Sequence, residues 1–139
     1  MLSDEGRMYS KSFPKNSILM TIAANIGFTA ITTQETWCPD SVVGIVPHDG
    51  IDVRFLEYVL RTKQHDLESR VATQTAQKNI NLQDLRPLGL DIPDIAAQEE
   101  IASQLQGIES AVTSLELRLA AARNLRLNLA NESIGVLGV

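Results

Sequence analysis

At 139 residues, with 44% hydrophobic and 21% charged side chains, the chain is expected to fold into one modest globular domain with an appendage. No apolar run reaches the roughly 18 residues of a membrane span, and the single cysteine, Cys38, excludes an internal disulfide. With an acidic N-terminus that does not resemble a signal peptide, these features predict a cytoplasmic protein. The net charge of −5 argues against strong non-specific DNA binding, which depends on many phosphate contacts.

The first half of the chain reads as short strands. Residues 1–16 are polar and carry no periodic signal. Residues 17–23 predict a short buried strand and residues 28–33 a second strand, so that the two form a hairpin-like pair. Residues 37–40 predict a turn, and residues 42–46 a third strand.

A helix is predicted after Asp52, which is a good N-cap. Apolar residues then recur at helical spacing, less clearly toward the end: Phe55, Leu56, Val59, Leu60 and Leu67. A polar loop over 73–79, a short helix around 82–85 and a strand over 88–92, closed by Pro93, are expected to follow. The predicted class for residues 1–92 is α/β, a mixed sheet with short helices.

The rest of the chain predicts one long helix. Asp94 can cap a helix that begins near Ile95 and runs to about Glu132, which is roughly 57 Å at about 1.5 Å per residue. Its apolar residues follow alternating spacings of four and three, interrupted by Arg126. This heptad seam consists of Ile101, Leu105, Ile108, Val112, Leu115, Leu119, Ala122 and Leu129. Residues 93–133 are therefore interpreted as a dimerisation helix in a coiled coil, and residues 134–139 as a loose tail.

The charges on this helix favour antiparallel pairing. Its first half carries four acidic residues and its second half three arginines, so antiparallel copies set opposite charges against each other. A parallel pair would set Arg126 against its own copy. The alternative is that the helix simply covers its own domain. The charged residues are Asp94, Glu99, Glu100, Glu109, Arg118, Arg123 and Arg126.

Catalytic constellations are not apparent in the sequence. His48 and His65 lack the spacing of metal ligands, and Cys38 between a tryptophan and a proline resembles a packed turn residue. No phosphate-binding glycine loop or zinc motif is present. The chain is therefore expected to be no enzyme by itself and to use neither metal nor cofactor.

One polar segment is a candidate for DNA contact. Amide side chains can bind adenine edges, and lysine can bind guanine or phosphate. Upstream cations could add phosphate contacts. The alternative is an ordinary solvated loop. The candidates are Gln74, Thr75, Gln77, Lys78 and Asn79, with Arg61, Lys63 and Arg70 upstream.

Taken together, these segments resemble the target-recognition domain of type I restriction–modification specificity subunits. The resemblance lies in the order and spacing of short stretches, and it covers residues 12–129. In one of them, Ala24 and Asn25 stand where the family has Gly-Thr. The matching stretches are 12–15 with 18–23, 25–27 with 29–30, 40–47, 55–60, 77–81 with Leu85, 90–93, and 98–102.

This resemblance implies a non-catalytic specificity subunit that directs a methyltransferase subunit, and a restriction subunit with it, to a bipartite DNA site. A full subunit of the family has two such domains and two antiparallel helices, so this chain is expected to act as a homodimer. It is also expected to lack the first half of the domain. The alternative is a truncated remnant that does not read DNA and serves only dimerisation or assembly.

Overall fold

The computed structural model describes residues 11–72, 85 and 88–136. The chain divides into two compact units, residues 1–102 and 103–139. The first unit contains the strands and short helices together with the start of the long helix, and the second contains the remainder of that helix.

The described part of the first unit contains two small antiparallel sheets. In the larger sheet β2 (Ile18–Thr21) lies between β3 (Thr29–Ile31) and β5 (Val42–Ile45), with Ile18 opposite Ile31 and Ile45. The predicted hairpin-like pair and third strand are thus confirmed. In the smaller sheet β1 (Lys11–Phe13) pairs with β4 (Thr36–Cys38).

The smaller sheet corrects two predictions. Residues 11–13 were expected to lack regular structure, and Trp37 and Cys38 were expected to form a turn. Both segments are strands because they pair with each other, Ser12 opposite Trp37. The turn begins only at Pro39, whose carbonyl accepts a hydrogen bond from the Val42 N–H.

The larger sheet is packed on both faces. Ile18 and Met20 are buried against the helix α2 (Val53–Thr62) in a cluster with Leu56 and Leu60. On the other face Gly44 lies beneath the Phe13 ring, since a Cβ at Gly44 would stand 2.1 Å from Phe13 Cδ1. Glycine is therefore required where the two sheets meet.

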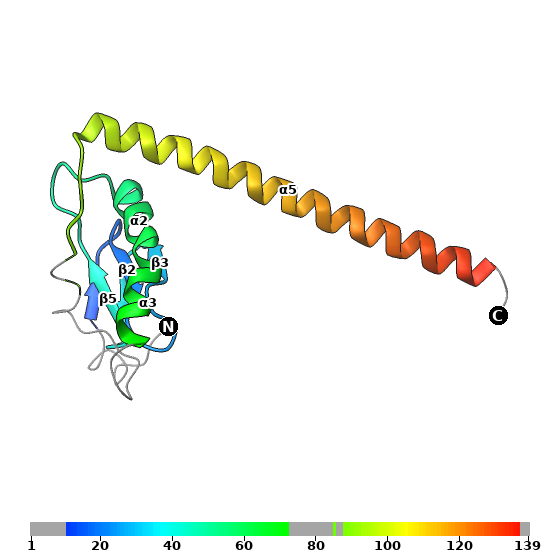
Figure 1. The fold of residues 1–139 in the computed structure, drawn as a ribbon, viewed down its shortest axis with the longest axis horizontal. Helices are drawn as coiled ribbons and strands as arrows, with labels where there is room; N and C mark the ends of the chain where they lie inside the picture. The colour runs from blue at the N-terminus through cyan, green and yellow to red at the C-terminus, as the bar shows by residue number, and fades with distance from the viewer. Residues whose placement is uncertain (1–10, 73–84, 86–87, 137–139) are drawn as a thin grey trace. The chain divides into compact units, whose positions relative to one another are not determined.

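The helix predicted after Asp52 is present but is split. The Asp52 carboxylate accepts hydrogen bonds from the Arg54 and Phe55 N–H groups at 3.0 and 2.8 Å, which confirms the N-cap. α2 ends at the C-cap Lys63, and α3 (Gln64–Ala72) follows at once and buries Leu67. Figure 1 shows α2 and α3 alongside β2 and β3.

The strand predicted over residues 88–92 is wrong. Residues 88–94 have no regular secondary structure, and the Leu88 N–H donates to the Leu85 carbonyl. Leu88 and Leu90 still pack against the core cluster, so side-chain packing accounts for the alternating apolar pattern without strand pairing. The predicted short helix around 82–85 lies outside the described residues except Leu85.

The long helix α5 (Ile95–Val136) begins where it was expected, with the Asp94 carboxylate accepting from the Ala97 N–H at 3.0 Å. It runs past Glu132, the predicted end. The α/β class with a long terminal helix is confirmed, and every strand pair in the described residues is antiparallel.

Candidate nucleic-acid interface and helix surfaces

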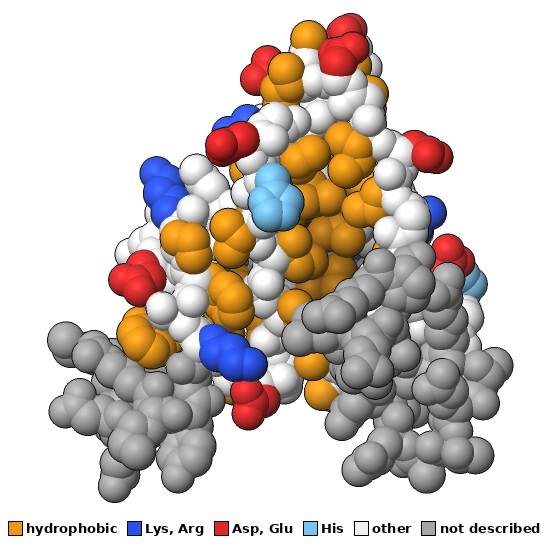
Figure 2. Space-filling view, turned by 90° about the vertical axis from the view of Figure 1, so that its left-hand side faces the viewer, with side chains coloured by type: hydrophobic (Ala, Val, Ile, Leu, Met, Phe, Trp, Pro, Cys, Tyr) orange, Lys and Arg blue, Asp and Glu red, His pale blue; other side chains and the backbone are white. Residues whose placement is uncertain are grey.

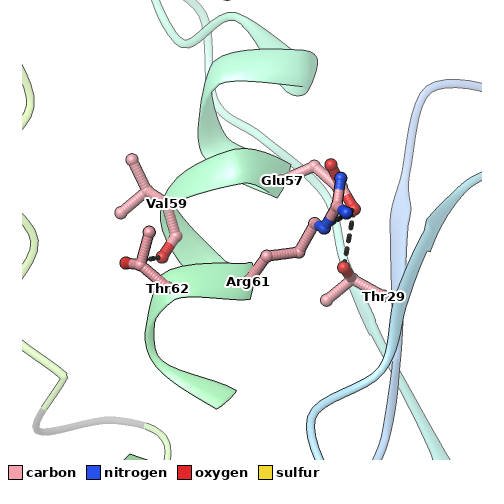
Figure 3. A network of polar contacts seen from close by, with 5 residues as sticks. All are labelled: Thr29, Glu57, Val59, Arg61 and Thr62. Atoms are coloured by element: carbon pink, nitrogen blue, oxygen red, sulfur yellow. Dashed lines mark hydrogen bonds and ion pairs between the residues drawn. The ribbon is translucent and has the colours of Figure 1, made fainter. Parts of the chain in front are cut away.

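Arg61 and Lys63, two predicted DNA contacts, lie at the C-terminal end of α2. The Arg61 Nε is 3.9 Å from Glu57 Oε1, and the same carboxylate oxygen accepts a hydrogen bond from Thr29 Oγ1 at 2.7 Å (Figure 3). The guanidinium also lies 5.7 Å from the centre of the Tyr58 ring. Glu57 thus ties Arg61 to β3 through Thr29 and offsets part of its charge, which leaves a half-exposed cation held in a defined place.

Sequence reasoning did not single out Glu57, although a signal for it exists. Glutamate four residues before arginine on a helix is a standard pairing pattern. The 2.7 Å hydrogen bond from Thr29, which lies 28 residues away in the chain, could not be read from that pattern.

The loop between β2 and β3 reaches the same corner. Gly27 adopts a φ of 81° and packs so closely on Gln64, the first residue of α3, that an added Cβ would lie 2.9 Å from Gln64 Cγ. The Thr21 hydroxyl organises this loop by bonding to the Phe28 N–H and the Asn25 carbonyl. Residues 25–28 therefore lie beside the junction of α2 and α3.

The other predicted DNA contacts lie outside the described residues. α3 ends at Ala72, directly before this segment, and nothing is described of the Arg70 side chain. The structure therefore brings Arg61 and Lys63 together on one helix end and leaves the rest as predictions: Gln74, Thr75, Gln77, Lys78 and Asn79.

The apolar seam of α5 is exposed to solvent. Its large residues range from 39% exposed at Ile101 to 61% at Leu115, with Leu105 half-buried. Within the described part of α5 only Gln98 and Ala102 are buried, and both belong to the first unit.

A second apolar stripe was missed because a heptad reading considers only the seam positions. Leu117 is the most exposed large apolar residue described, at 68%, and Leu127 is 55% exposed. Each lies two residues from a seam leucine, which is about 200° around a helix. The second stripe, Leu117, Ala120, Ala121 and Leu127, therefore lies on the opposite side of α5 from the seam.

The start of α5 is held by one buried amide. Gln98 is 1% exposed, and its Oε1 accepts a hydrogen bond from the Asp52 N–H at 2.9 Å. Its Nε2 donates to the Pro93 carbonyl at 2.8 Å and to the Gly50 carbonyl at 3.1 Å. The amide group therefore has a partner for its oxygen and for each of its two N–H groups.

An apolar cavity of about 490 Å³ opens beside β5. It is lined by residues 43–48, by Leu56 and Leu60 of α2, and by Leu85, Leu88 and Leu90. Figure 2 shows the hollow as a hydrophobic patch with a histidine at its rim. It offers little for polar chemistry, and the described residues contain no cluster of three side chains suited to a metal ion.

Cys38 is no nucleophile candidate. The residue is 5% exposed, and burial raises the pKa of its thiol, which keeps it protonated and unreactive near neutral pH.

A family model for the type I restriction modification DNA specificity domain matches residues 3–121. The chain belongs to this family. It is a specificity domain of type I restriction–modification systems, a class whose subunits are non-catalytic. Among its described helices, none combines the length and apolarity that a membrane crossing requires.

Two solved structures share the fold of this specificity domain. The HsdS subunit from Thermoanaerobacter tengcongensis gives a TM-score of 0.65 at 21% identity over 76% of this chain. A chain from a structure concerning complex assembly and conformational transition of the type I R-M system gives 0.64 at 23% identity, also over 76%. This chain spans about a quarter of each, 25% and 26% respectively.

Proposed function

We propose that this specificity domain directs a type I methyltransferase subunit to a bipartite DNA site and does so as an antiparallel coiled-coil homodimer. The observation that carries the proposal is the exposed seam of α5 in a chain that belongs to the specificity family. Adenine methylation and ATP-driven cleavage are assigned to partner subunits.

Burial of the seam supplies the driving force for dimerisation. Seven large aliphatic residues lie on it, and full burial of each is worth roughly 1.5–3 kcal/mol. They are about half exposed in the single chain, so packing against a second copy of the helix can bury this surface and gain a large part of that free energy. The acidic first half and the arginines of the second half favour the antiparallel arrangement.

We assign the second stripe to the methyltransferase subunit. A partner helix packed on the seam leaves the opposite side of α5 open, and Leu117 and Leu127 are more than half exposed there. Exposed apolar stripes mark protein–protein contacts. Self-association and partner binding would thus use opposite sides of one helix.

Arg61 and Lys63 are assigned to DNA phosphates, and the segment after α3 to base edges. The whole chain carries a net charge of −5, so its own attraction to DNA is weak and the assembled complex must supply further positive charge. Base contacts are assigned to Gln77, Lys78 and Asn79.

The test is co-expression with the methyltransferase subunit from the same organism, followed by mapping of methylated adenines across a genome. Methylation at a palindromic two-part site is the expected result. Triple alanine replacement of Gln77, Lys78 and Asn79 should abolish it while the complex still assembles. A complex that forms but adds no methylation would instead favour the assembly-only role, which the acidic charge also suggests.

A further inference from the structure

The start of α5, up to Ala102, belongs to the first unit and packs there through few side chains. Within the described part of α5, only Gln98 and, one turn later, Ala102 are buried. Residues at positions i and i+4 lie on the same face of a helix, so these two form a single narrow contact. Ala102 offers only a methyl group. Most of the specific interaction therefore comes from the Gln98 amide.

Gln98 contacts backbone rather than other side chains. Its side-chain oxygen accepts a hydrogen bond from the backbone N–H of Asp52, which is the N-cap residue of α2. One amide therefore joins the N-terminal ends of α2 and α5. The Gly50 carbonyl is presented by a turn in which Gly50 has a φ of 84°, and the Pro93 carbonyl directly precedes the N-cap Asp94. These three bonds require one orientation of the helix start.

Such an arrangement is a costly way to gain stability alone. Burying an amide and restricting a long side chain costs energy that its hydrogen bonds only modestly exceed. An apolar side chain of similar length, such as methionine, would fill the same volume without that cost. Hydrogen bonds differ from apolar packing because they depend on direction.

We propose that Gln98 is a positioning residue that holds the start of α5 in one orientation on the recognition unit and thereby restricts the gap between the two DNA half-sites. The inference rests on the proposed function, because gap length has meaning only for a two-part reader. Gln98 touches no DNA in this proposal and acts through α5.

The decisive variant is Gln98→Met, which keeps the side-chain volume and removes the three hydrogen bonds. Ser103→Ala, an exposed change five residues further along the same helix, is the control. Each chain is assembled with the methyltransferase subunit, and methylation is measured on DNA in which the two half-sites are separated by the natural gap or by one base pair more or less. The wild type and Ser103→Ala should prefer one gap. In Gln98→Met the ratio of methylation at the natural gap to methylation at the altered gaps should fall about tenfold. Methylation at the natural gap itself should be retained.

Unchanged gap preference in Gln98→Met would overturn the inference, and so would an equal loss of methylation at all gaps. A second readout does not depend on DNA. Hydrogen exchange at the Asp52 amide of the full chain should be at least about tenfold faster in Gln98→Met than in Ser103→Ala, because the amide loses its acceptor. Equal exchange would also refute the anchor. If the wild type methylates no two-part site while Asp52 exchange still responds, the proposed function has failed and the anchor has not.

Discussion

Replacement of Leu115 by alanine should weaken self-association much more than replacement of Leu117, although the two leucines are close neighbours. Leu115 lies on the seam and Leu117 on the second stripe, and they are 61% and 68% exposed. Exposure and residue type are thus matched, and only the face of the helix differs.

The expected magnitude follows from the area that a partner helix can cover. Leucine to alanine removes three carbons, worth about 2.4 kcal/mol at roughly 0.8 kcal/mol each when fully buried. Because 61% of Leu115 is exposed in the single chain, about 1.5 kcal/mol of this arises on dimerisation for each copy. Two copies give about 3 kcal/mol, or roughly a 100-fold increase in the dimer dissociation constant.

Sedimentation equilibrium of the wild type, Leu115→Ala and Leu117→Ala over a range of concentrations measures this directly. Leu117→Ala should dimerise like the wild type and lose affinity for the methyltransferase subunit instead. Equal dissociation constants for the two variants, or a wild type that stays monomeric at all concentrations, would refute the assignment of the two faces.

Three further predictions concern the first unit. Ala24 has a φ of 61°, a region that costs an L-residue about 1–2 kcal/mol, so Ala24→Gly should raise the free energy of unfolding by about 1 kcal/mol in urea titrations. Gly44→Ala should lower the free energy of unfolding by about 1–3 kcal/mol, since the new Cβ would overlap the Phe13 ring. Phe13→Ala should destabilise the Gly44→Ala chain less than it destabilises the wild type. Burial raises the pKa of the Cys38 thiol, so the folded state favours the protonated form. The contribution of this thiol to the free energy of unfolding is therefore complete below the ordinary thiol pKa and is lost as pH rises through the raised pKa. Alkylation of Cys38 at pH 8 should accordingly be slow in the folded chain and fast in urea.

Features that depend on neighbours in the chain could be predicted from the sequence. The caps Asp52 and Asp94 bond N–H groups only two or three residues away, and the α5 seam is a regular repeat. Ala24 is a related case, since the resemblance to the family predicts glycine at this position and the residue adopts the positive φ that favours glycine.

Features that depend on distant pairing could not be predicted. β1 and β4 form only when Ser12 meets Trp37, and neither segment has a strong pattern of its own. The side chain of Gln98 bonds to Asp52, which lies 46 residues earlier in the chain. In the sequence, the start of this helix resembles an ordinary polar first turn. The strand predicted over residues 88–92 is wrong for the opposite reason. The alternation of Leu88 and Leu90 fits a strand, but it arises from packing against the core without strand pairing.

The seam raises a question of register that Arg126 can answer. An apolar heptad seam can slip by seven residues and still pair, which shifts one helix along the other by about 10 Å at about 1.5 Å per residue. For a two-part reader that shift corresponds to about three base pairs of gap at 3.4 Å each. A polar residue within a seam disfavours all registers but those that satisfy it, at some cost in stability. Arg126→Leu should therefore tighten the dimer in sedimentation experiments yet allow methylation at a second gap about three base pairs from the first. Tighter dimers that keep a single gap would assign the register to the flanking charges Glu109, Arg118 and Arg123 instead.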